Sequence, residues 1–517
     1  MKTVNILWAD DEIDLLKPHI LFLEEKGCRV HPAVSGQDAV AACREESFDL
    51  VFLDENMPGL GGLETLLEIK KIQPSLPVVM ITKSEEEDLM EQAIGQQIAD
   101  YLIKPVHPKQ VLMAVKKLVH AQDIITEKTT LDYQSQFMQL SNRIDSAQTP
   151  ADWQALYKEL LHWELQLSDA NPGMTGMLLS QKTEADACFA KFIKKEYARW
   201  MGDNADRPLL SPDLFKTKVF PLLDRGEKVF FVLIDNLRLD QWAVLQRELA
   251  KDFTFVEDDT FYSILPTTTQ YSRNAVFAGL MPLQIRQMFP ELWVDEEEDE
   301  GKNQNEEALI ATQLKRFRKN YKFSYNKIAD NLTGEKYNER LKSLEANDLN
   351  VVVFNFVDML SHARTEVKLF RDLAPDEAAY RSLVHSWFKH GCIADFFRQL
   401  GGMDVTIVLA TDHGSVRVKN PVKVSGDKHT NSNLRYKLGK NLGYDAKDFY
   451  VVDRPQEIGL PCPNLSTCYL FARNDDFVAY PNNYNYYVSY YRDTFQHGGV
   501  SMEEMIIPVA TFKPKRP

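Results

Sequence analysis

Residues 228–235 read KVFFVLID, a run of six apolar residues between a lysine and an aspartate. Three further stretches have a similar apolar character: DFTFVED at 252–258, NVVVFNFVD at 350–358 and DVTIVLATD at 404–412. Continuous apolar runs are typical of strands that are buried on both faces of a sheet. All four stretches as quoted end in an aspartate, at the carboxyl end of the predicted strand, where α/β sheets bind their ligands. Residues 216–517 are therefore expected to form an α/β domain.

The first 120 residues show the same alternation in a smaller domain. The strand candidates are VNILWA, CRVHPA, DLVFLD, PVVMIT and DYLIKP, with helical patterns such as GQDAVAACREE between them. Five β/α units predict a parallel sheet with helices on both faces, which would occupy residues 1–120.

Residues 121–215 contain no convincing strand. Apolar residues recur there at helical spacing, as in Trp153, Leu156, Tyr157, Leu160 and Leu167. The segment is predicted to be a small helical bundle that links the two α/β domains. The acidic run DEEEDE at 295–300 is expected to be a solvated surface loop.

The overall composition excludes several functional classes. The chain of 517 residues carries 60 Lys and Arg against 75 Asp and Glu, a formal net charge of -15, which disfavours binding of duplex DNA. Its six cysteines are scattered without CxxC spacing, so neither a disulfide framework nor a cysteine zinc finger is indicated. No apolar run approaches the ~20 residues of a membrane span. We expect a cytoplasmic protein without membrane insertion.

Five polar residues fall at successive strand ends of the first domain. Asp10 and Asp11 follow the first predicted strand, and Asp54 ends the third. Thr82 ends the fourth strand and Lys104 the fifth. Clustered carboxylates at strand ends favour Mg²⁺, which prefers oxygen ligands. We expect Asp54 to accept a phosphoryl group whose oxygens contact Lys104 and Thr82.

These residues resemble the phosphoacceptor pocket of the receiver domains of two-component response regulators. The resemblance implies that Asn56 offers a backbone carbonyl to Mg²⁺. It also implies that Thr82 and Tyr101 are the switch residues, with Tyr101 following Thr82 inward on activation. A sensor histidine kinase would then be the phosphate donor.

The C-terminal domain contains six candidate metal ligands in a definite order. They are Asp235, Asp358, His362, Asp412, His413 and His497. Asp358 and His362 are four residues apart, which puts both on one face of a helix. Mixed Asp and His ligands favour Zn²⁺, with Mn²⁺ as a lesser alternative.

A threonine-rich turn lies between the first and second ligands. Residues 263–282 read SILPTTTQYSRNAVFAGLMP, so the threonines precede a helical stretch of small residues. Hydroxyl groups at a helix N-terminus occupy an anion-binding position, and a metal-bound hydroxyl is a competent nucleophile.

The order of these residues resembles the alkaline phosphatase superfamily, and most closely its PglZ branch. The resemblance implies two Zn²⁺ sites, one formed by Asp235, Thr269, Asp412 and His413, and the other by Asp358, His362 and His497. It also implies that Thr269 is the nucleophile, because diesterase members read Pro-Thr-x-Thr, which aligns with residues 266–269. The three consecutive threonines leave an ambiguity of one or two residues.

Four further residues are candidates for contacts with the substrate. Arg273 lies near the threonines, while His429, Arg435 and Lys437 could meet a second phosphate, although a solvated loop explains these three nearly as well. We find no equivalent of the extra charged groups that monoesterases of the superfamily use. The sequence therefore favours phosphodiesters, and nucleotide diesters in particular, linear or cyclic, and it leaves sulfate and phosphonate esters open.

Taken whole, the chain resembles PorX-type response regulators. The implied architecture is multidomain α/β: a CheY-like receiver, a helical bundle linker and an alkaline-phosphatase-like α/β domain. The resemblance implies regulation of the type IX secretion system, with a secretion component or a sigma factor as partner. In a competing interpretation, the zinc-bound domain is a non-catalytic docking module for such partners.

Phosphorylation is expected to promote a homodimer through the partly apolar helix SEEEDLMEQAIGQQI at 84–98. The alternative is that the receiver docks on its own catalytic domain and is released on phosphorylation, without self-association.

Overall fold

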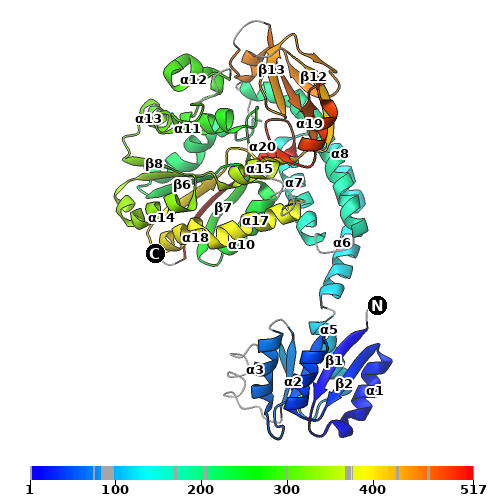
Figure 1. Ribbon diagram of the computed structural model, residues 1–517. Coiled ribbons are helices and arrows are strands. Elements are labelled where there is room, and N and C mark those ends of the chain that lie inside the picture. Colours follow the sequence, from blue (N-terminus) through cyan, green and yellow to red (C-terminus); the bar gives the residue numbers. More distant parts are fainter. Residues whose placement is uncertain are drawn as a thin grey trace. The chain divides into compact units, whose positions relative to one another are not determined.

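The structure is a computed structural model that describes residues 3–73, 76–82, 98–119, 121–167, 172–202, 207–296, 301–366, 374, 376–426, 430–462 and 466–515. The chain divides into two compact units (Figure 1). One ends at Asp132 and the other starts at Tyr133. Each unit has its own sheet and its own core.

The first unit contains a five-stranded parallel sheet in the order β2-β1-β3-β4-β5, which confirms the predicted strands. The strands are β1 (Val4–Ala9), β2 (Cys28–Ala33), β3 (Leu50–Asp54), β4 (Val78–Thr82) and β5 (Asp100–Ile103). The helices described beside them are η1 (Ile13–Leu16), α1 (Lys17–Glu25), α2 (Gly36–Glu45), α3 (Gly62–Ile72) and α5 (Pro108–Leu118). The strand order reverses next to β1, so the ends of β1 and β3 border one crevice.

The core of this unit lies on both faces of the sheet, because side chains alternate along each strand. Leu7 and Val51 pack on the face covered by α2 and α3. Trp8 and Phe52 pack on the opposite face with α1 and α5, and their rings lie 5.2 Å apart. Burial on both faces fixes the register and brings the polar strand ends together.

The linker is helical, as predicted. It comprises α6 (Ala121–Ser146), α7 (Pro150–Leu167), α8 (Pro172–Glu196) and the turn η2 (Tyr197–Met201). The ring of Trp153 on α7 lies 5.4 Å from Phe189 on α8, and Phe189 stacks at 6.3 Å on Tyr262 of the C-terminal domain. From Tyr133 onward, the linker therefore shares a compact unit with that domain.

A six-stranded sheet in the order β7-β19-β10-β6-β9-β8 forms the centre of the second unit. Its strands are β6 (Val229–Ile234), β7 (Phe253–Tyr262), β8 (Phe323–Ile328), β9 (Leu349–Phe354), β10 (Thr406–Ala410) and β19 (Ile506–Pro514). The pairs among β10, β6, β9 and β8 are parallel, whereas β19 runs antiparallel to both β10 and β7.

Helices cover both faces of this sheet. Figure 1 shows α10 (Leu239–Leu249), α14 (Asn331–Glu339), α17 (Glu377–His390) and α18 (Cys392–Leu400) along one face, and α11 (Asn274–Ala278) and α13 (Glu306–Arg316) along the other. The other helical segments are η3 (Ser211–Asp213), η4 (Phe215–Val219), α9 (Phe220–Asp224), η5 (Thr269–Arg273), α12 (Pro282–Met288), η6 (Pro290–Leu292), η7 (Leu341–Ala346), α15 (Phe356–Glu366), η8 (Pro455–Ile458), α19 (Tyr484–Tyr491) and α20 (Met502–Met505).

Three small sheets lie in the segment between β10 and β19. They comprise β11 (Val416–Arg417) with β18 (Phe495–Gln496), β12 (Asn420–Ser425) with β14 (Gly443–Tyr444) and β17 (Asp476–Ala479), and β13 (Tyr436–Lys440) with β15 (Phe449–Val452) and β16 (Thr467–Ala472). The first of them holds the chain just before His497 next to the chain that follows His413.

Two expectations from the sequence were wrong. The run 252–258 belongs to β7, which is an edge strand with several exposed residues and is not buried on both faces. Glu296, in the acidic run, is not a freely solvated side chain, because it accepts hydrogen bonds from Tyr436 at 2.8 Å and from Tyr271 at 3.3 Å. Residues 297–300 of that run lie outside the described part of the chain.

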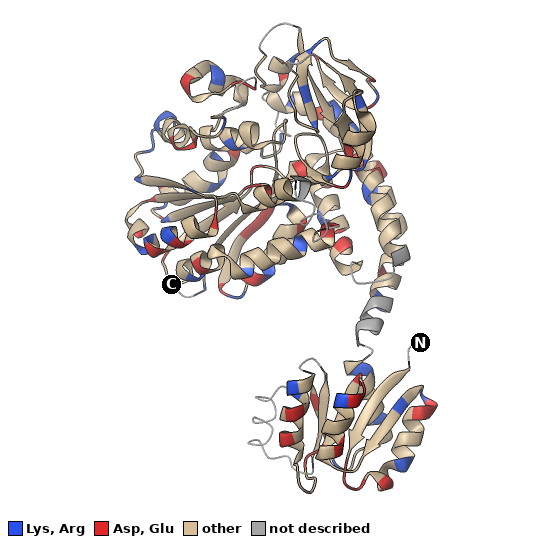
Figure 2. Ribbon diagram, in the orientation of Figure 1, with Lys and Arg blue, Asp and Glu red and all other residues tan. Residues whose placement is uncertain are grey.

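Figure 2 shows basic and acidic residues interspersed along α10, α14 and α17 of the second unit. Among the described residues, no helix is both long and apolar enough to cross a membrane.

A buried ionic network joins the linker helices to the C-terminal domain. Glu164 on α7 lies 2.6 Å from Lys182 on α8 and 2.9 Å from Arg381 on α17. Arg381 also pairs with Asp240 at 2.8 Å, and Lys182 lies 3.3 Å from Glu503. Buried charges of this kind are tolerated only when every member keeps its partner.

The network predicts a large loss of stability in Arg381→Met. The substitution removes one of the two cationic partners of both Glu164 and Asp240, and breaking a buried pair costs about 3–5 kcal/mol. Calorimetric unfolding of the full chain should show this loss in the transition of the second unit.

The matched control is Arg398→Met, since the Arg398 side chain is 75% exposed in its pair with Asp395. An exposed pair contributes about 0–1 kcal/mol. Equal effects of the two substitutions would contradict a structural role for the buried network.

Candidate functional site

The strand ends of the first unit bring three charged groups into contact. Lys104 Nζ lies 2.9 Å from Asp10 Oδ2 and 2.9 Å from Asp54 Oδ1. Asp10 and Asp54 are buried, whereas Asp11 is exposed at the rim. One carboxylate oxygen from each of the three aspartates lies within 4.8 Å of the others, an arrangement that suits a divalent cation.

This pocket contains more negatively charged than positively charged side chains. Burial raises the pKa of Asp54, and the hydrogen bond and charge of Lys104 oppose that rise. Burial disfavours the charged form of Lys104, but its hydrogen bonds to Asp10 and Asp54 raise its pKa overall. One ammonium group therefore serves two buried carboxylates, and a bound Mg²⁺ would supply the missing charge.

The other receiver residues named from the sequence are Thr82, Asn56 and Tyr101. Thr82 Oγ1 donates a hydrogen bond to the carboxylate of Glu55, and Asn56 is exposed. Tyr101 is 39% exposed. The helix expected at 84–98 falls almost wholly outside the described residues, so the dimer surface placed on it stays a prediction.

In the second unit, Asp235, Asp412 and His413 come together at the ends of β6 and β10. His413 Nε2 lies 3.8 Å from Asp235 Oδ1 and 3.9 Å from Asp412 Oδ2. All three side chains are buried, and one ligand atom of each lies within 4.8 Å of the others.

A second ligand group is formed by Asp358, His362 and His497. Asp358 lies in the first turn of α15, four residues after the end of β9, and His362 lies one helical turn further on. Asp358 is 3.5 Å from His362 Nε2 and 3.6 Å from His497 Nε2. The imidazoles of His413 and His497 stack with centroids 4.2 Å apart, so the two groups adjoin each other.

Asn236 connects the two groups. Its backbone N–H donates to Asp412 Oδ1 at 3.2 Å, and its side-chain amide donates to Asp358 Oδ1 at 3.2 Å. Its φ of 61° is left-handed, a conformation in which asparagine is enriched among non-glycine residues. The sequence analysis missed this residue, although its position directly after Asp235 was an available signal.

The protonation states suit metal binding. Burial lowers the pKa of His413, and it lowers that of His497 to about 3, so both imidazoles are neutral near pH 7. Burial opposes ionisation of Asp358, but the hydrogen bond from His362 and the nearby histidines lower its pKa overall. Neutral imidazole and ionised carboxylate are the forms that bind metals.

One buried carboxylate oxygen of the first ligand group lacks a hydrogen-bond partner among the described residues. Burial raises the pKa of both Asp235 and Asp412. Asp412 Oδ2 accepts no hydrogen bond from any described residue. A buried acceptor without a partner is costly, and a cation ligated by this oxygen would remove the cost. The donor set therefore fits a metal ion.

The three consecutive threonines occupy different environments. Thr269 Oγ1 lies 3.2 Å from His413 Nε2 and donates to Asp235 Oδ1 at 3.4 Å. Thr267 Oγ1 instead donates to the carbonyl of Gly499 at 3.1 Å. Thr268 Oγ1 is buried without a hydrogen-bond partner among the described residues. Of the three, Thr269 has its hydroxyl against the first ligand group.

Arg273 is buried next to the first ligand group and is not exposed at the opening of the site. It is 1% exposed and donates to Asp235 Oδ2 at 2.8 Å. Its Nε lies 2.6 Å from Glu306, a buried acid at the start of α13. The sequence analysis missed Glu306, because nothing local distinguishes it from other acids in the first turn of a helix.

The remaining substrate candidates are engaged elsewhere. Arg435 is fully buried, with its guanidinium 2.6 Å from Glu504. Lys437 donates to the carbonyl of Asn431 at 2.7 Å, and burial lowers its pKa to about 7. His429 lies outside the described residues.

Comparison with protein-family models finds three matches in chain order. A response regulator receiver domain matches residues 6–116, a PorX response regulator linker domain matches residues 123–201, and a BREX system PglZ alkaline phosphatase-like domain matches residues 214–512. This order is that of the PorX-type architecture.

Curated relatives resemble only part of the chain. The transcriptional regulatory protein ResD of Bacillus subtilis is 32% identical over 115 residues, 22% of this chain and 48% of ResD. The response regulator UvrY of Escherichia coli is 33% identical over 125 residues, 24% of this chain and 57% of UvrY. The chain thus spans about half of the length of these relatives.

Two solved receiver domains are similar to part of the chain. The receiver domain of NtrX from Brucella abortus shows 32% identity and a TM-score of 0.21, covering 22% of this chain and 98% of its own. A receiver domain protein from Clostridium thermocellum shows 31% identity and a TM-score of 0.22, covering 23% and 98%.

The receiver pocket predicts that Asp54 is the phosphoacceptor. Incubation with acetyl phosphate and Mg²⁺ should phosphorylate the wild type and leave Asp54→Asn unmodified, as measured by intact mass. Asp14→Asn is the matched control, because the Asp14 side chain is 84% exposed and lies outside the carboxylate cluster. Equal modification of Asp54→Asn and the wild type would refute the assignment.

The two ligand groups predict two bound metal ions per C-terminal domain. His413→Ala and His362→Ala should each lower the zinc content by about one ion per chain, as measured by elemental analysis. His385→Ala is the control, since His385 pairs with Glu248 and belongs to neither group. Unchanged zinc in both ligand variants would count against these sites.

Proposed function

The chain belongs to the PglZ alkaline phosphatase-like family, and on this premise we propose that it is a response regulator with a two-metal phosphodiesterase as its output domain. Phosphorylation at Asp54 would control this activity. The observation that carries the proposal is the Thr269 hydroxyl against one ligand group, next to a second ligand group bridged to it by Asn236.

The proposed metal is Zn²⁺ at both positions, because the donors are imidazole nitrogens and carboxylate oxygens. Asp235, Asp412, His413 and Thr269 would hold one ion. Asp358, His362 and His497 would hold the other. When bound, a metal pair lowers the pKa of a coordinated hydroxyl and stabilises the attacking and leaving oxygens of a displacement.

Thr269 is the proposed nucleophile. Its Oγ1 releases its proton to solvent and attacks phosphorus, a new P–O bond forms, and the bond to the leaving alkoxide breaks. The alkoxide departs with a proton from solvent, and water then hydrolyses the phosphothreonine. Thr269 and Arg273 lie one helical turn apart on η5, so the contact of Arg273 with Asp235 holds the hydroxyl in place.

A phosphodiester is the favoured substrate, in the form of a linear or cyclic nucleotide diester. A diester carries one negative charge, whereas a monoester near pH 7 carries about -1.5 to -2 and needs more positive charge at the site. Arg273, Arg435 and Lys437 are all engaged with protein partners. None of these three cations therefore stands ready for a dianion.

A receiver domain implies a phosphodonor such as a histidine kinase. The match to the PorX linker supports a role in regulating the type IX secretion system, with a secretion component or sigma factor as partner. A phosphorylation-dependent homodimer is part of the same proposal.

The nucleophile assignment predicts that Thr269→Ala abolishes turnover of bis-(p-nitrophenyl) phosphate. The loss should be roughly 10³-fold or more, as for other covalent nucleophiles. Zinc content and thermal stability should stay close to those of the wild type, which separates loss of chemistry from loss of the site.

Thr268→Ala is the matched control and should keep most of its activity. An inactive Thr268→Ala together with an active Thr269→Ala would move the nucleophile by one position. A zinc-loaded wild type without turnover, in the presence and absence of beryllofluoride, would favour the non-catalytic docking role.

A further inference from the structure

A buried acid outside both ligand groups is linked to the first of them. Arg273 Nη1 lies 2.8 Å from Asp235 Oδ2, and Arg273 Nε lies 2.6 Å from Glu306 Oε1. The side chains of Glu306 and Arg273 are each 1% exposed. Glu306 begins α13 and belongs to neither metal-ligand group. Its influence on Asp235 therefore passes through the guanidinium of Arg273.

The carboxylate of Glu306 is held in place from its other side. Tyr325 donates a hydrogen bond to Glu306 Oε2, and the Tyr325 ring lies 6.0 Å from Phe277. Lys327 Nζ lies 3.5 Å from the same oxygen, but its side chain is 31% exposed, so solvent weakens its charge. Glu306 thus directs one oxygen towards Tyr325 and Lys327 and the other towards Arg273.

The charges around Arg273 match those of a divalent cation. When ionised, Asp235, Asp412 and Glu306 supply three negative charges, against the one positive charge of Arg273. The neutral imidazole of His413 adds none. An excess of two negative charges is costly in a buried site, and it equals the charge of Zn²⁺. The zinc-loaded first site is therefore electrically balanced only when Glu306 is included.

The second ligand group has a different charge arrangement. It contains one carboxylate, that of Asp358, which pairs with His362 at 3.5 Å and with His497 at 3.6 Å. Its ligands approach one another without an intervening guanidinium. A change of charge at Glu306 should therefore affect the first site more than the second.

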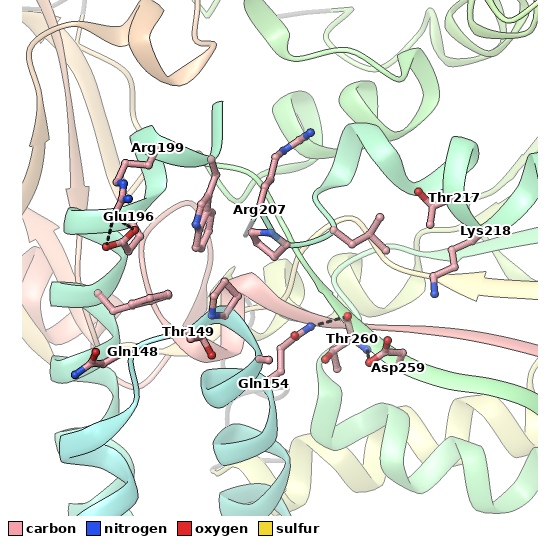
Figure 3. Close-up of a pocket in the computed structure, with 16 residues that line it drawn as sticks. Gln148, Thr149, Gln154, Glu196, Arg199, Arg207, Thr217, Lys218, Asp259 and Thr260 are labelled. Carbon is pink, nitrogen blue, oxygen red and sulfur yellow. Dashed lines mark hydrogen bonds and ion pairs between the residues drawn. The ribbon is translucent and has the colours of Figure 1, made fainter. Parts of the chain in front are cut away.

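Charged residues that line a separate cavity show one-to-one pairing instead. This cavity, of about 600 Å³, lies between the ends of the linker helices and β7 (Figure 3). Figure 3 shows Arg199 with Glu196 on one side of it and Lys218 on the other. Arg199 pairs with Glu196 at 2.8 Å, and Lys218 with Glu257 at 2.5 Å. Each of these pairs is neutral by itself, whereas three acids share the one cation of Arg273.

We propose that Glu306 is a positioning residue of the first metal site, which offsets the charge of Arg273 so that Asp235 and Asp412 remain available to a dication. The inference rests on the metal site proposed above. Without Glu306, the guanidinium would repel a metal ion bound by the two aspartates, because buried charges are poorly screened. Residues that hold metal ligands from behind typically change metal affinity by roughly 10–100-fold, and we expect a loss of this size.

Zinc titration of the full chain against a chromophoric chelator tests the proposal in two backgrounds. His362→Ala keeps the first ligand group, and His413→Ala keeps the second. Glu306→Gln should weaken zinc binding by roughly 10–100-fold in the His362→Ala background. It should leave zinc binding unchanged in the His413→Ala background, which also shows that the fold is intact. Glu307→Gln is the matched control, because Glu307 is exposed on the same first turn of α13, and it should change neither affinity.

A further variant separates the effect of charge from that of packing. Arg273→Met combined with Glu306→Gln removes one positive and one negative charge, so the loaded first site stays balanced. In the His362→Ala background it should bind zinc more tightly than Glu306→Gln alone, whereas weaker binding would overturn the proposal. Equal effects of Glu306→Gln in the two backgrounds, or no effect in either, would overturn it as well. A wild type that binds no zinc would instead refute the metal site itself.

Discussion

The arrangement of the candidate metal site depends on the buried guanidinium of Arg273. It contacts Asp235 at 2.8 Å and Glu306 at 2.6 Å, and it lies 3.9 Å from Asp412. Without this positive charge, three buried carboxylates would repel one another in an environment that screens them poorly. Arg273 also ends the short helical turn that begins with Thr269. The same turn therefore places the cation that neutralises the acids and the hydroxyl that faces the ligand group.

The same rule, that a buried charge needs a partner, organises the rest of the second unit. Glu164 and Lys182 of the linker belong to an ionic network that reaches Arg381 and Asp240. Asp240 pairs in turn with Arg238, which follows Asp235 by three residues. Displacement of α7 or α8 would therefore leave charges unpaired close to the first ligand group, and the linker is part of the framework that holds the site.

Local sequence patterns identified the central parallel strands of the second sheet, but they did not predict the positions of β7 and β19. β6, β9 and β10 are buried on both faces, so their apolar runs alone identified them. β7 has a similar run but lies at an edge, and β19 lies between antiparallel partners with a polar end. Edge position depends on which strands pair, and one strand's own residues do not encode it.

By itself the sequence determined the three-part α/β architecture and the chemistry of the strand ends, because apolar runs followed by acids are local patterns. The tertiary structure alone decided which of those groups meet. Thr269 rather than Thr268 faces His413, 144 residues away, and Asn236 joins two aspartates from different elements. Arg435 pairs with Glu504, which lies 69 residues later in the chain. Contacts across such separations depend on how strands and helices pack, which no local pattern records.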